Sequence, residues 1–144
     1  MAVIVVFHHV HGLTPGVSSF AGRLREAGHT VIAPDLFAGE RFDTIEAGAA
    51  HASSIGFDVV IERGVAAVAE LEQPFTVVGF SLGVLPAQRL AQSDERIRAA
   101  VLCHSCVPLE EFGDEWPDSV AVQIHAMEED PYFLDDGDMD AALD

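Results

Sequence analysis

The residues with the clearest chemical potential lie at Gly79-Phe80-Ser81-Leu82-Gly83, where glycines stand two positions before and two positions after a serine. An apolar, strand-forming segment precedes this motif and a helix-forming segment follows it. On so sharp a strand-to-helix turn the backbone is crowded, and only residues without a Cβ fit at the two flanking positions. The pattern predicts that Ser81 is a nucleophile held on a nucleophile elbow.

A tight glycine turn after a strand also occurs in nucleotide-binding sheets, where Ser81 would have no chemical role. This turn lacks the Lys-Ser/Thr pair of a phosphate-binding loop, and no further glycine follows three residues on. The sequence therefore favours the nucleophile over the bystander interpretation.

A serine hydroxyl is a weak nucleophile at neutral pH and needs an adjacent base, for which an oriented imidazole is the usual choice. The tetrahedral intermediate also needs two backbone N–H donors, each contributing about 3 kcal/mol. We expect Leu82, the residue after the nucleophile, to supply one donor. Val10, in the loop His9-Val10-His11-Gly12 after the first predicted strand, is expected to supply the other.

Asp130, in Glu128-Glu129-Asp130-Pro131, follows a predicted strand by a few residues and lies downstream of Ser81. The order serine, then acid, then histidine is typical of this architecture, with the acid on a loop at the carboxyl end of a later strand. Asp before Pro is also an ordinary turn sequence in so acidic a chain. Together with the serine motif, the position predicts that Asp130 is the acid that orients the histidine.

The elements that would hold these residues alternate between strand and helix. Short apolar runs predict strands over 3–7, 29–33, 75–80, 99–103 and 120–125, and helical periodicity predicts helices over 15–27, 57–71 and 82–92. Residues 43–56 predict a weak helix or an irregular connection. We therefore expect one α/β domain over 1–144, a three-layer sandwich with helices on both faces of a mostly parallel sheet, and function at the carboxyl ends of the strands.

Composition narrows the class of partner. The 144 residues carry a formal net charge of -17, and all seven basic residues are arginine. Such a chain repels nucleic acid and anionic membrane surfaces, so a small molecule is the expected partner. No apolar run approaches the roughly 20 residues of a membrane span, and the N-terminal segment lacks the basic flank of a signal peptide.

The cysteines and histidines predict neither a disulfide framework nor a metal site. Cys103 and Cys106 are the two cysteines, which fits a reducing cytoplasm. We expect Cys103 in the core, Cys106 at a polar loop position, and His125 as a buried imidazole within its strand. The spacing of the histidines at 8, 9, 11, 104 and 125 matches no zinc-binding pattern.

Four segments together resemble the dienelactone hydrolase family of α/β-hydrolases, and the resemblance covers essentially the whole chain. They are the Pro-Asp-Leu-Phe segment within 33–38, the serine motif within 77–83, the strand at 100–104, and the strand and loop at 124–130. The resemblance implies hydrolysis of a small carboxylic ester or lactone through an acyl-enzyme. It also implies a lidless single-domain enzyme that needs no metal or cofactor.

Two departures from the family pattern open alternatives. The namesake enzymes of the family use cysteine where this chain has Ser81, so a general esterase is as well supported as a dienelactone hydrolase. The family's histidine follows the acid by several tens of residues, whereas no histidine follows His125 here. We expect either that the chain is C-terminally incomplete, with its histidine beyond Asp144, or that His9 acts as a substitute base. The remaining alternative is a non-catalytic domain that binds a small ligand or partner.

Overall fold

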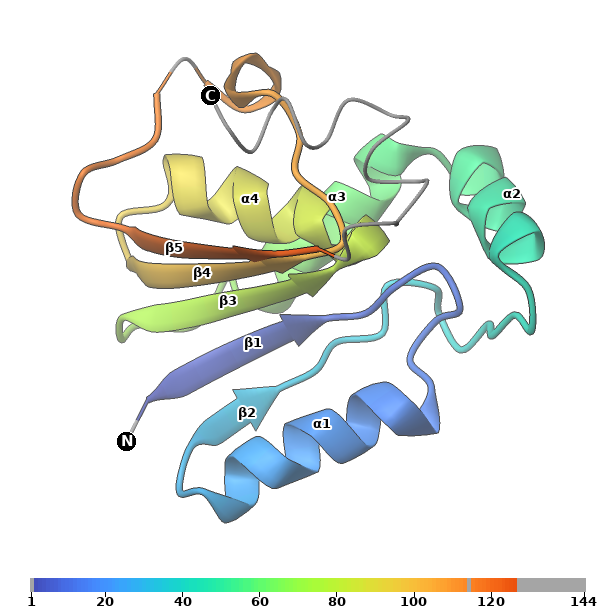
Figure 1. Cartoon of the computed structure of the whole chain (residues 1–144), viewed down its shortest axis with the longest axis horizontal. Coiled ribbons are helices and arrows are strands. Elements are labelled where there is room, and N and C mark those ends of the chain that lie inside the picture. The colour runs from blue at the N-terminus through green and yellow to red at the C-terminus, as the bar shows by residue number, and fades with distance from the viewer. Residues whose placement is uncertain (1, 114, 127–144) are drawn as a thin grey trace.

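The computed structural model describes residues 2–113 and 115–126, and within them the strands form one parallel sheet. The strands are β1 (Val3–Phe7), β2 (Thr30–Ile32), β3 (Phe75–Phe80), β4 (Ile97–Cys103) and β5 (Ala121–His125). The helices are α1 (Pro15–Glu26), α2 (Ile45–Ile55), α3 (Phe57–Ala67) and α4 (Val84–Ser93), with short 3-10 turns η1 (Ser81–Gly83) and η2 (Leu109–Glu111). The strand order is β2-β1-β3-β4-β5, which places β3 at the centre (Figure 1).

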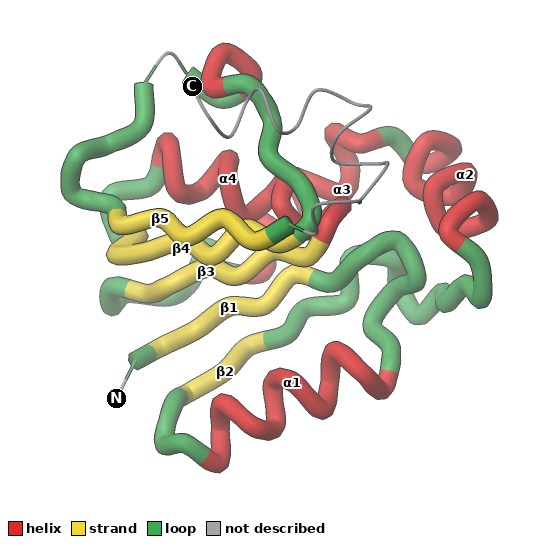
Figure 2. The backbone as a smooth tube through the Cα atoms, viewed as in Figure 1, coloured by secondary structure: helices red, strands yellow, loops and turns green. Residues whose placement is uncertain are grey.

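Helices cover both faces of this sheet. α1 lies on one face, α3 and α4 lie on the other, and α2 lies beyond the carboxyl ends of the strands (Figures 1 and 2). Because successive strand residues point to opposite faces, Val5 and Phe7 enter the core under α3 and α4, whereas Val6 packs against Val17 of α1. The predicted three-layer α/β architecture is confirmed.

One connection settles an alternative that the sequence left open, and another differs from the expectation. The segment expected to be weakly helical or irregular forms α2, whose first turn is capped because the Thr44 hydroxyl accepts the Ala47 N–H at 3.1 Å. The helix expected to run to residue 71 instead ends at Ala67. The Arg96 guanidinium then donates hydrogen bonds to carbonyl oxygens of the turn that follows α3, which ties this turn to the start of β4.

The β5 edge of the sheet is much less buried than the rest. Val122 is 42% exposed, and His125 is exposed rather than buried. The expectation of a buried His125 was therefore wrong: β5 is an edge strand, and the hydrophobic cluster of described residues on the α1 face contains no residue of β5. The expectation for Cys106 was also wrong, because its side chain is buried.

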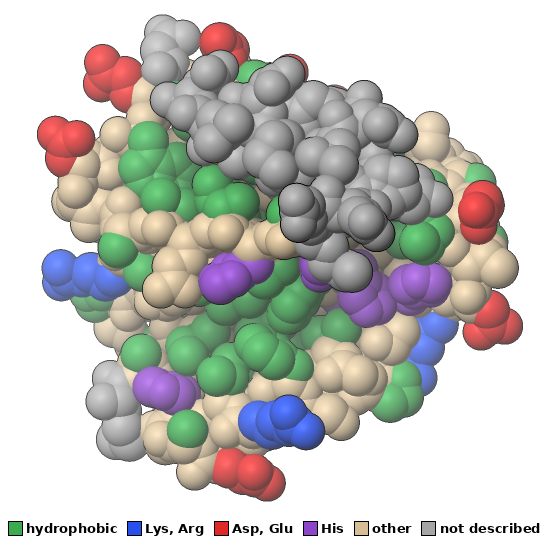
Figure 3. Space-filling model, in the orientation of Figure 1, with side chains coloured by type: hydrophobic (Ala, Val, Ile, Leu, Met, Phe, Trp, Pro, Cys, Tyr) green, Lys and Arg blue, Asp and Glu red, His purple; other side chains and the backbone are tan. Residues whose placement is uncertain are grey.

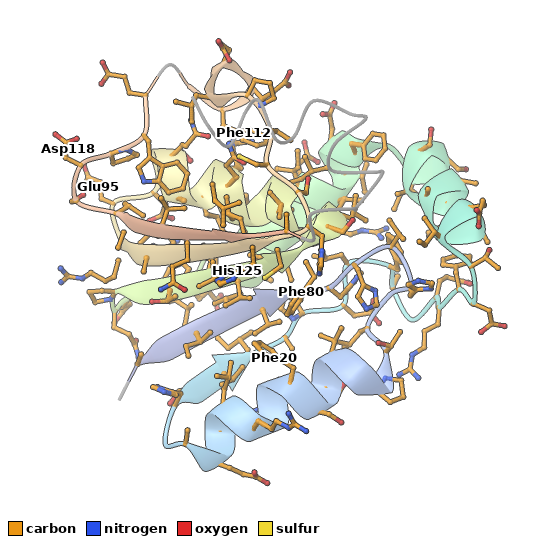
Figure 4. The ribbon with its side chains drawn as sticks, viewed as in Figure 1. Phe20, Phe80, Glu95, Phe112, Asp118 and His125 are labelled. Carbon is orange, nitrogen blue, oxygen red and sulfur yellow. The ribbon has the colours of Figure 1, made fainter. Side chains whose placement is uncertain are left out.

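The face that carries α1 shows this difference directly. Figure 3 shows hydrophobic side chains gathered in a hollow on this face, with histidine at its border. Phe20 of α1 and Phe80 of β3 meet there edge to face, with ring centroids 5.2 Å apart, and His125 lies on the same side of the sheet (Figure 4). Among the described residues, those that follow β1 are thus more buried than His104, which follows β4, and His125, which ends β5.

Candidate active site

Ser81 lies at the point where β3 ends and the chain turns into η1 and α4. Its φ is 54°, in the left-handed region that a residue with a Cβ rarely adopts. A backbone conformation of this kind costs about 1–3 kcal/mol and persists only where the surrounding packing imposes it. Ser81 is half-buried, so its position at the carboxyl edge of the sheet stays accessible.

The two glycines of the motif are required by close packing around this turn. A Cβ placed on Gly79 would lie 2.5 Å from the carbonyl oxygen of Gly83. A Cβ placed on Gly83 would lie 2.2 Å from the carbonyl oxygen of Phe7, at the end of β1. At Gly79, near the end of β3, the strand therefore packs against the turn itself, and at Gly83 the turn packs against the end of β1.

Strand register places His9 beside the serine on the β1 side. Phe7 pairs with Gly79 in the β1–β3 ladder, so His9 and Ser81 each stand two residues further along their chains. Both residues therefore follow neighbouring strands at the same carboxyl edge of the sheet.

Register also places a histidine on the β4 side, and this residue was not assigned to the site from sequence. Phe80 pairs with Cys103 in the β3–β4 ladder, so Ser81 and His104 both follow the last paired row. Knowing which strands are neighbours, and in which register, is the signal that identifies His104. We refer to His9, Ser81 and His104 as the Ser81 row.

His9 is half-buried, and its hydrogen bonding defines its tautomer. The N–H of His11 donates to Nδ1 of His9 at 3.3 Å, and the two rings meet edge to face. Because Nδ1 accepts, the proton of the neutral ring resides on Nε2. Burial lowers the pKa of His9, and the neighbouring His11 and His8 lower it further, so the ring stays neutral to more acidic pH than an exposed histidine.

His8 is fully buried and links β1 to the loop after β2. Its Nε2 accepts the N–H of Leu36 at 2.9 Å, and its Nδ1 donates to the His9 carbonyl at 2.7 Å. Burial lowers the pKa of His8 and outweighs the opposing effects of the His9 carbonyl and of Asp35. Asp35 lies 3.8 Å from Nε2, but this nitrogen carries no proton while it accepts from Leu36, so the neutral ring makes no ion pair.

Val10, the expected oxyanion donor, lies in a loop against which α2 packs. A Cβ on Gly48 of α2 would lie 2.0 Å from the Val10 carbonyl oxygen, so α2 rests directly on this backbone. His11, the residue after Val10, makes two hydrogen bonds with Phe42. The Phe42 N–H donates to the His11 carbonyl at 2.9 Å, and His11 Nδ1 donates to the Phe42 carbonyl at 2.8 Å. The loop that carries Val10 is therefore well supported.

Leu82, the other expected donor, follows Ser81 and is buried at the start of the η1–α4 segment. The first N–H groups of a helix have no acceptor within the helix, so they are available to a ligand. Gly83, one residue on, packs against the end of β1, from which the Val10 loop departs. The structure thus brings the backbone of Leu82 and the loop of Val10 to the same end of the sheet.

The segment after β2 has a structural role. The Asp35 carboxylate accepts the N–H groups of Phe37 at 2.9 Å and Gly39 at 3.0 Å, which closes the turn. Arg63 of α3 donates to the Leu36 carbonyl at 2.8 Å. Its guanidinium is thereby engaged in holding this turn.

Asp130, the expected orienting acid, lies outside the described residues.

Within residues 2–113 and 115–126, no three His, Cys, Asp or Glu side chains converge to hold a metal ion. In the same residues, no helix combines the length and the apolar character needed to cross a membrane.

The parallel sheet, its helical layers and the serine turn after the central strand define an α/β-hydrolase-type fold. The model of the dienelactone hydrolase family matches residues 1–143, and the chain therefore belongs to this family. No curated protein matches the chain.

Solved structures with the same fold include hydrolases of this family. The chain superposes on m3DLH with a TM-score of 0.72 at 22% identity, covering 98% of this chain and 62% of that one. A dienelactone hydrolase-like promiscuous phosphotriesterase from metagenomic libraries gives a TM-score of 0.72 at 18% identity, with 99% and 63% covered.

A cold-adapted esterase from an Arctic intertidal metagenomic library gives a TM-score of 0.62 at 18% identity, covering 96% of this chain and 82% of that one. The chain spans less than two thirds of the length of the first two structures. These similarities show the fold.

Proposed function

We propose that the protein hydrolyses a small carboxylic ester or lactone through an acyl-enzyme on Ser81. The observation that carries the proposal is the left-handed Ser81 on a glycine-crowded turn between β3 and α4. In this proposal the turn is a nucleophile elbow, which presents the hydroxyl at the carboxyl edge of a parallel sheet. Family membership and the hydrolase fold support it.

The reaction proceeds in two stages. Ser81 Oγ attacks the carbonyl carbon of the ester while an imidazole takes the hydroxyl proton, and the backbone N–H groups of Val10 and Leu82 donate to the oxyanion. The intermediate collapses to the acyl-enzyme when the C–O bond breaks and the imidazolium returns the proton to the departing alcohol. Water then attacks the acyl carbon with the imidazole as base, which releases the acid and regenerates Ser81. These steps need no metal or cofactor.

The sequence offers two further candidate residues for this reaction, His9 and Asp130. His9 stands beside Ser81 on the β1 side and is a candidate for the base, and Asp130 is the candidate acid that orients the imidazole. A base must present an unprotonated nitrogen to the hydroxyl. Nε2 of His9 bears the proton while Nδ1 accepts from His11, so His9 acts through Nε2 only after this hydrogen bond is given up.

The same hydrogen bond favours a second candidate function. If His9 keeps its Nδ1 partner and no other base reaches Ser81, the domain binds a small ligand at the carboxyl edge without hydrolysing it. The supported loop around Val10 and the hollow beside Phe80 would then serve recognition alone.

We also place the protein in the cytoplasm with a small-molecule partner. Cys103 and Cys106 are the only two cysteines of the sequence and give no disulfide framework, which fits a reducing compartment. The net charge of -17 disfavours nucleic acid and anionic surfaces as partners.

Reaction with a fluorophosphonate probe separates the hydrolase from the binding domain. We expect the folded 144-residue chain to gain the mass of one adduct, and Ser81→Ala to gain none. Ser93→Ala is the matched control, because Ser93 is an exposed α4 serine whose hydroxyl donates to the Arg89 carbonyl. A folded wild-type sample that forms no adduct would favour the binding function.

A further inference from the structure

The buried ring of His8 acts on the peptide group that joins His9 to Val10. His8 Nδ1 donates to the His9 carbonyl oxygen at 2.7 Å, and the Gly12 N–H donates to the same oxygen at 3.1 Å. A peptide group is planar, and the described residues contain no cis peptide bond. Fixing the His9 oxygen therefore also fixes the direction of the Val10 N–H, which points to the opposite side of this peptide from the His8 ring.

The peptide group on the other side of Val10 is held by packing. A Cβ placed on Gly48 of α2 would lie 2.0 Å from the Val10 carbonyl oxygen and 2.7 Å from the carbonyl carbon. Val10 therefore lies between two peptide groups, neither of which rotates unless a hydrogen bond breaks or α2 moves.

The loop after β2 determines which nitrogen of His8 is the donor. The Leu36 N–H donates to Nε2 at 2.9 Å, so the single proton of the neutral ring resides on Nδ1, facing the His9 carbonyl. Leu36 is itself held, because Arg63 of α3 donates to its carbonyl at 2.8 Å. Burial disfavours the charged ring and lowers the pKa of His8, so this neutral form is the one present at neutral pH.

The backbone of His8 lies against the serine turn. A Cβ placed on Gly83 would lie 2.8 Å from the His8 carbonyl oxygen, and Gly83 directly follows Leu82. His8 thus contacts both segments that are expected to donate to the oxyanion, the turn through its carbonyl group and the Val10 peptide through its ring. Its side chain is fully buried, so any effect of His8 on the reaction is transmitted through these neighbours.

We propose that His8 is a positioning residue of the oxyanion hole, whose Nδ1–H holds the His9–Val10 peptide so that the Val10 N–H faces the oxyanion. This inference rests on the proposed function, because it requires Val10 to donate to the oxyanion formed in the reaction of Ser81. Donors that are already oriented need no reorganisation when the charge develops, which is why they contribute strongly to the rate. A Val10 peptide released from His8 loses this advantage even where the fold is kept.

Two substitutions of His8 in the 144-residue chain separate positioning from stability. The Asn carboxamide stands at the level of Nδ1, so His8→Asn keeps a donor for the His9 carbonyl but leaves the Leu36 N–H without its acceptor. The Gln carboxamide stands at the level of Nε2, so His8→Gln keeps the acceptor for Leu36 but releases the His9 carbonyl. Val31→Ala, at a buried position of β2 in the cluster on the α1 face, is the control for a general loss of stability.

The first measurement compares the rate of Ser81 labelling by a fluorophosphonate with the urea midpoint of each variant. We expect His8→Gln to lower the maximal labelling rate by about 10- to 100-fold at an unchanged half-saturating probe concentration, because the lost interaction belongs to the transition state. His8→Asn should unfold at lower urea than His8→Gln, since its Leu36 N–H is buried and unpaired. It should nevertheless label at least about ten times faster than His8→Gln, and Val31→Ala should label at the wild-type rate.

The second measurement uses nuclear magnetic resonance and does not depend on activity. In the wild type, the ring nitrogen shifts should show the His8 proton on Nδ1. The Val10 amide signal should be sharp in the wild type, in His8→Asn and in Val31→Ala. It should broaden in His8→Gln, because a released peptide exchanges between orientations.

The outcomes distinguish the two proposals. The positioning role of His8 would be overturned, with Ser81 kept as the nucleophile, by any of three results: a His8 proton on Nε2, a Val10 amide signal equally sharp in His8→Gln, or labelling rates that follow the stabilities of the two variants. A folded wild-type chain without Ser81-dependent labelling would overturn the proposed function, and with it the oxyanion role of Val10 and His8.

Discussion

The two sides of Ser81 are built differently. On the β1 side, buried His8 ties the end of the strand to Leu36, and α2 rests on the Val10 backbone at Gly48. On the β4 side, His104 is exposed and the neighbouring strand β5 ends in exposed His125. Among the described residues, the backbone on the β1 side is therefore held by more packing and hydrogen bonds than the backbone on the β4 side.

The two faces of the sheet also differ, in the size of the hydrophobic cluster that each one buries. The larger core cluster lies between the sheet and α3 and α4, and it includes Phe7, Phe75 and Leu102. The smaller cluster, on the α1 face, is centred on Val6 and Val17. β5 gains little from either cluster, so the free energy of folding is concentrated in β1, β3, β4 and the helices packed on them.

The largest expected effect contrasts buried β1 with exposed β5 directly. Phe7→Ala removes a fully buried ring at the end of β1 and should lower the free energy of unfolding by about 3–5 kcal/mol. Val122→Ala, on exposed β5, should change it by no more than about 0.5 kcal/mol. Urea unfolding followed by circular dichroism measures both. Equal losses at the two positions would show that the two sides are equally buried.

The next effect tests how tightly the serine turn rests on β1. In Gly83→Ala the new Cβ meets backbone oxygens of both Phe7 and His8, which cannot swing aside, so we expect a loss of about 3 kcal/mol. Gly22→Ala is the control, because nothing lies within 4 Å of a Cβ there and the position is inside α1. It should raise stability by about 0.5–1 kcal/mol. If both variants melt like the wild type, the close approach at Gly83 is not present in solution.

A smaller, pH-dependent effect tests the role of His8. His8→Asn leaves the buried Leu36 N–H without its acceptor, at a cost of about 1–3 kcal/mol near pH 7.5. The pKa of His8 is lowered in the folded state, so as pH falls below the ordinary value of 6.5 the unfolded chain binds more protons and the protein loses stability. This contribution is complete above about pH 6.5 and decreases toward the lower folded-state pKa.

Thermal melts of His8→Asn and the wild type between pH 5 and 8 measure this dependence. The difference in melting temperature should narrow as the pH falls, because only the wild type has His8 to protonate. His9 titrates in the same direction, so part of the slope remains in the variant. A constant gap between His8→Asn and the wild type would contradict a buried, neutral His8.

Much of the fold follows from local patterns. Continuous apolar runs located β1 and β3, the latter directly after Pro74, and the glycines around Ser81 indicated the turn at which β3 ends. Segment 43–56 was harder, because small residues give little helical periodicity. The helix there depends on the Thr44 cap and on packing of Gly48 against a loop far away in the sequence.

Strand order and register were the information that local patterns lacked. His104 follows an apolar run in the sequence, but its place beside Ser81 appears only once Phe80 and Cys103 are known to pair. The exposure of His125 has the same origin, because an apolar strand sequence does not say whether a helix covers the strand. The tautomer of His9 likewise depends on a neighbouring backbone N–H, which residue types alone do not reveal.

The most direct test of the central claim is to map the fluorophosphonate adduct by peptide mass spectrometry on the folded 144-residue chain. The account predicts a single adduct on Ser81, absent in Ser81→Ala and present in Ser93→Ala. A folded wild-type protein with no adduct, or with its adduct on another residue, would contradict the assignment of Ser81 as the nucleophile.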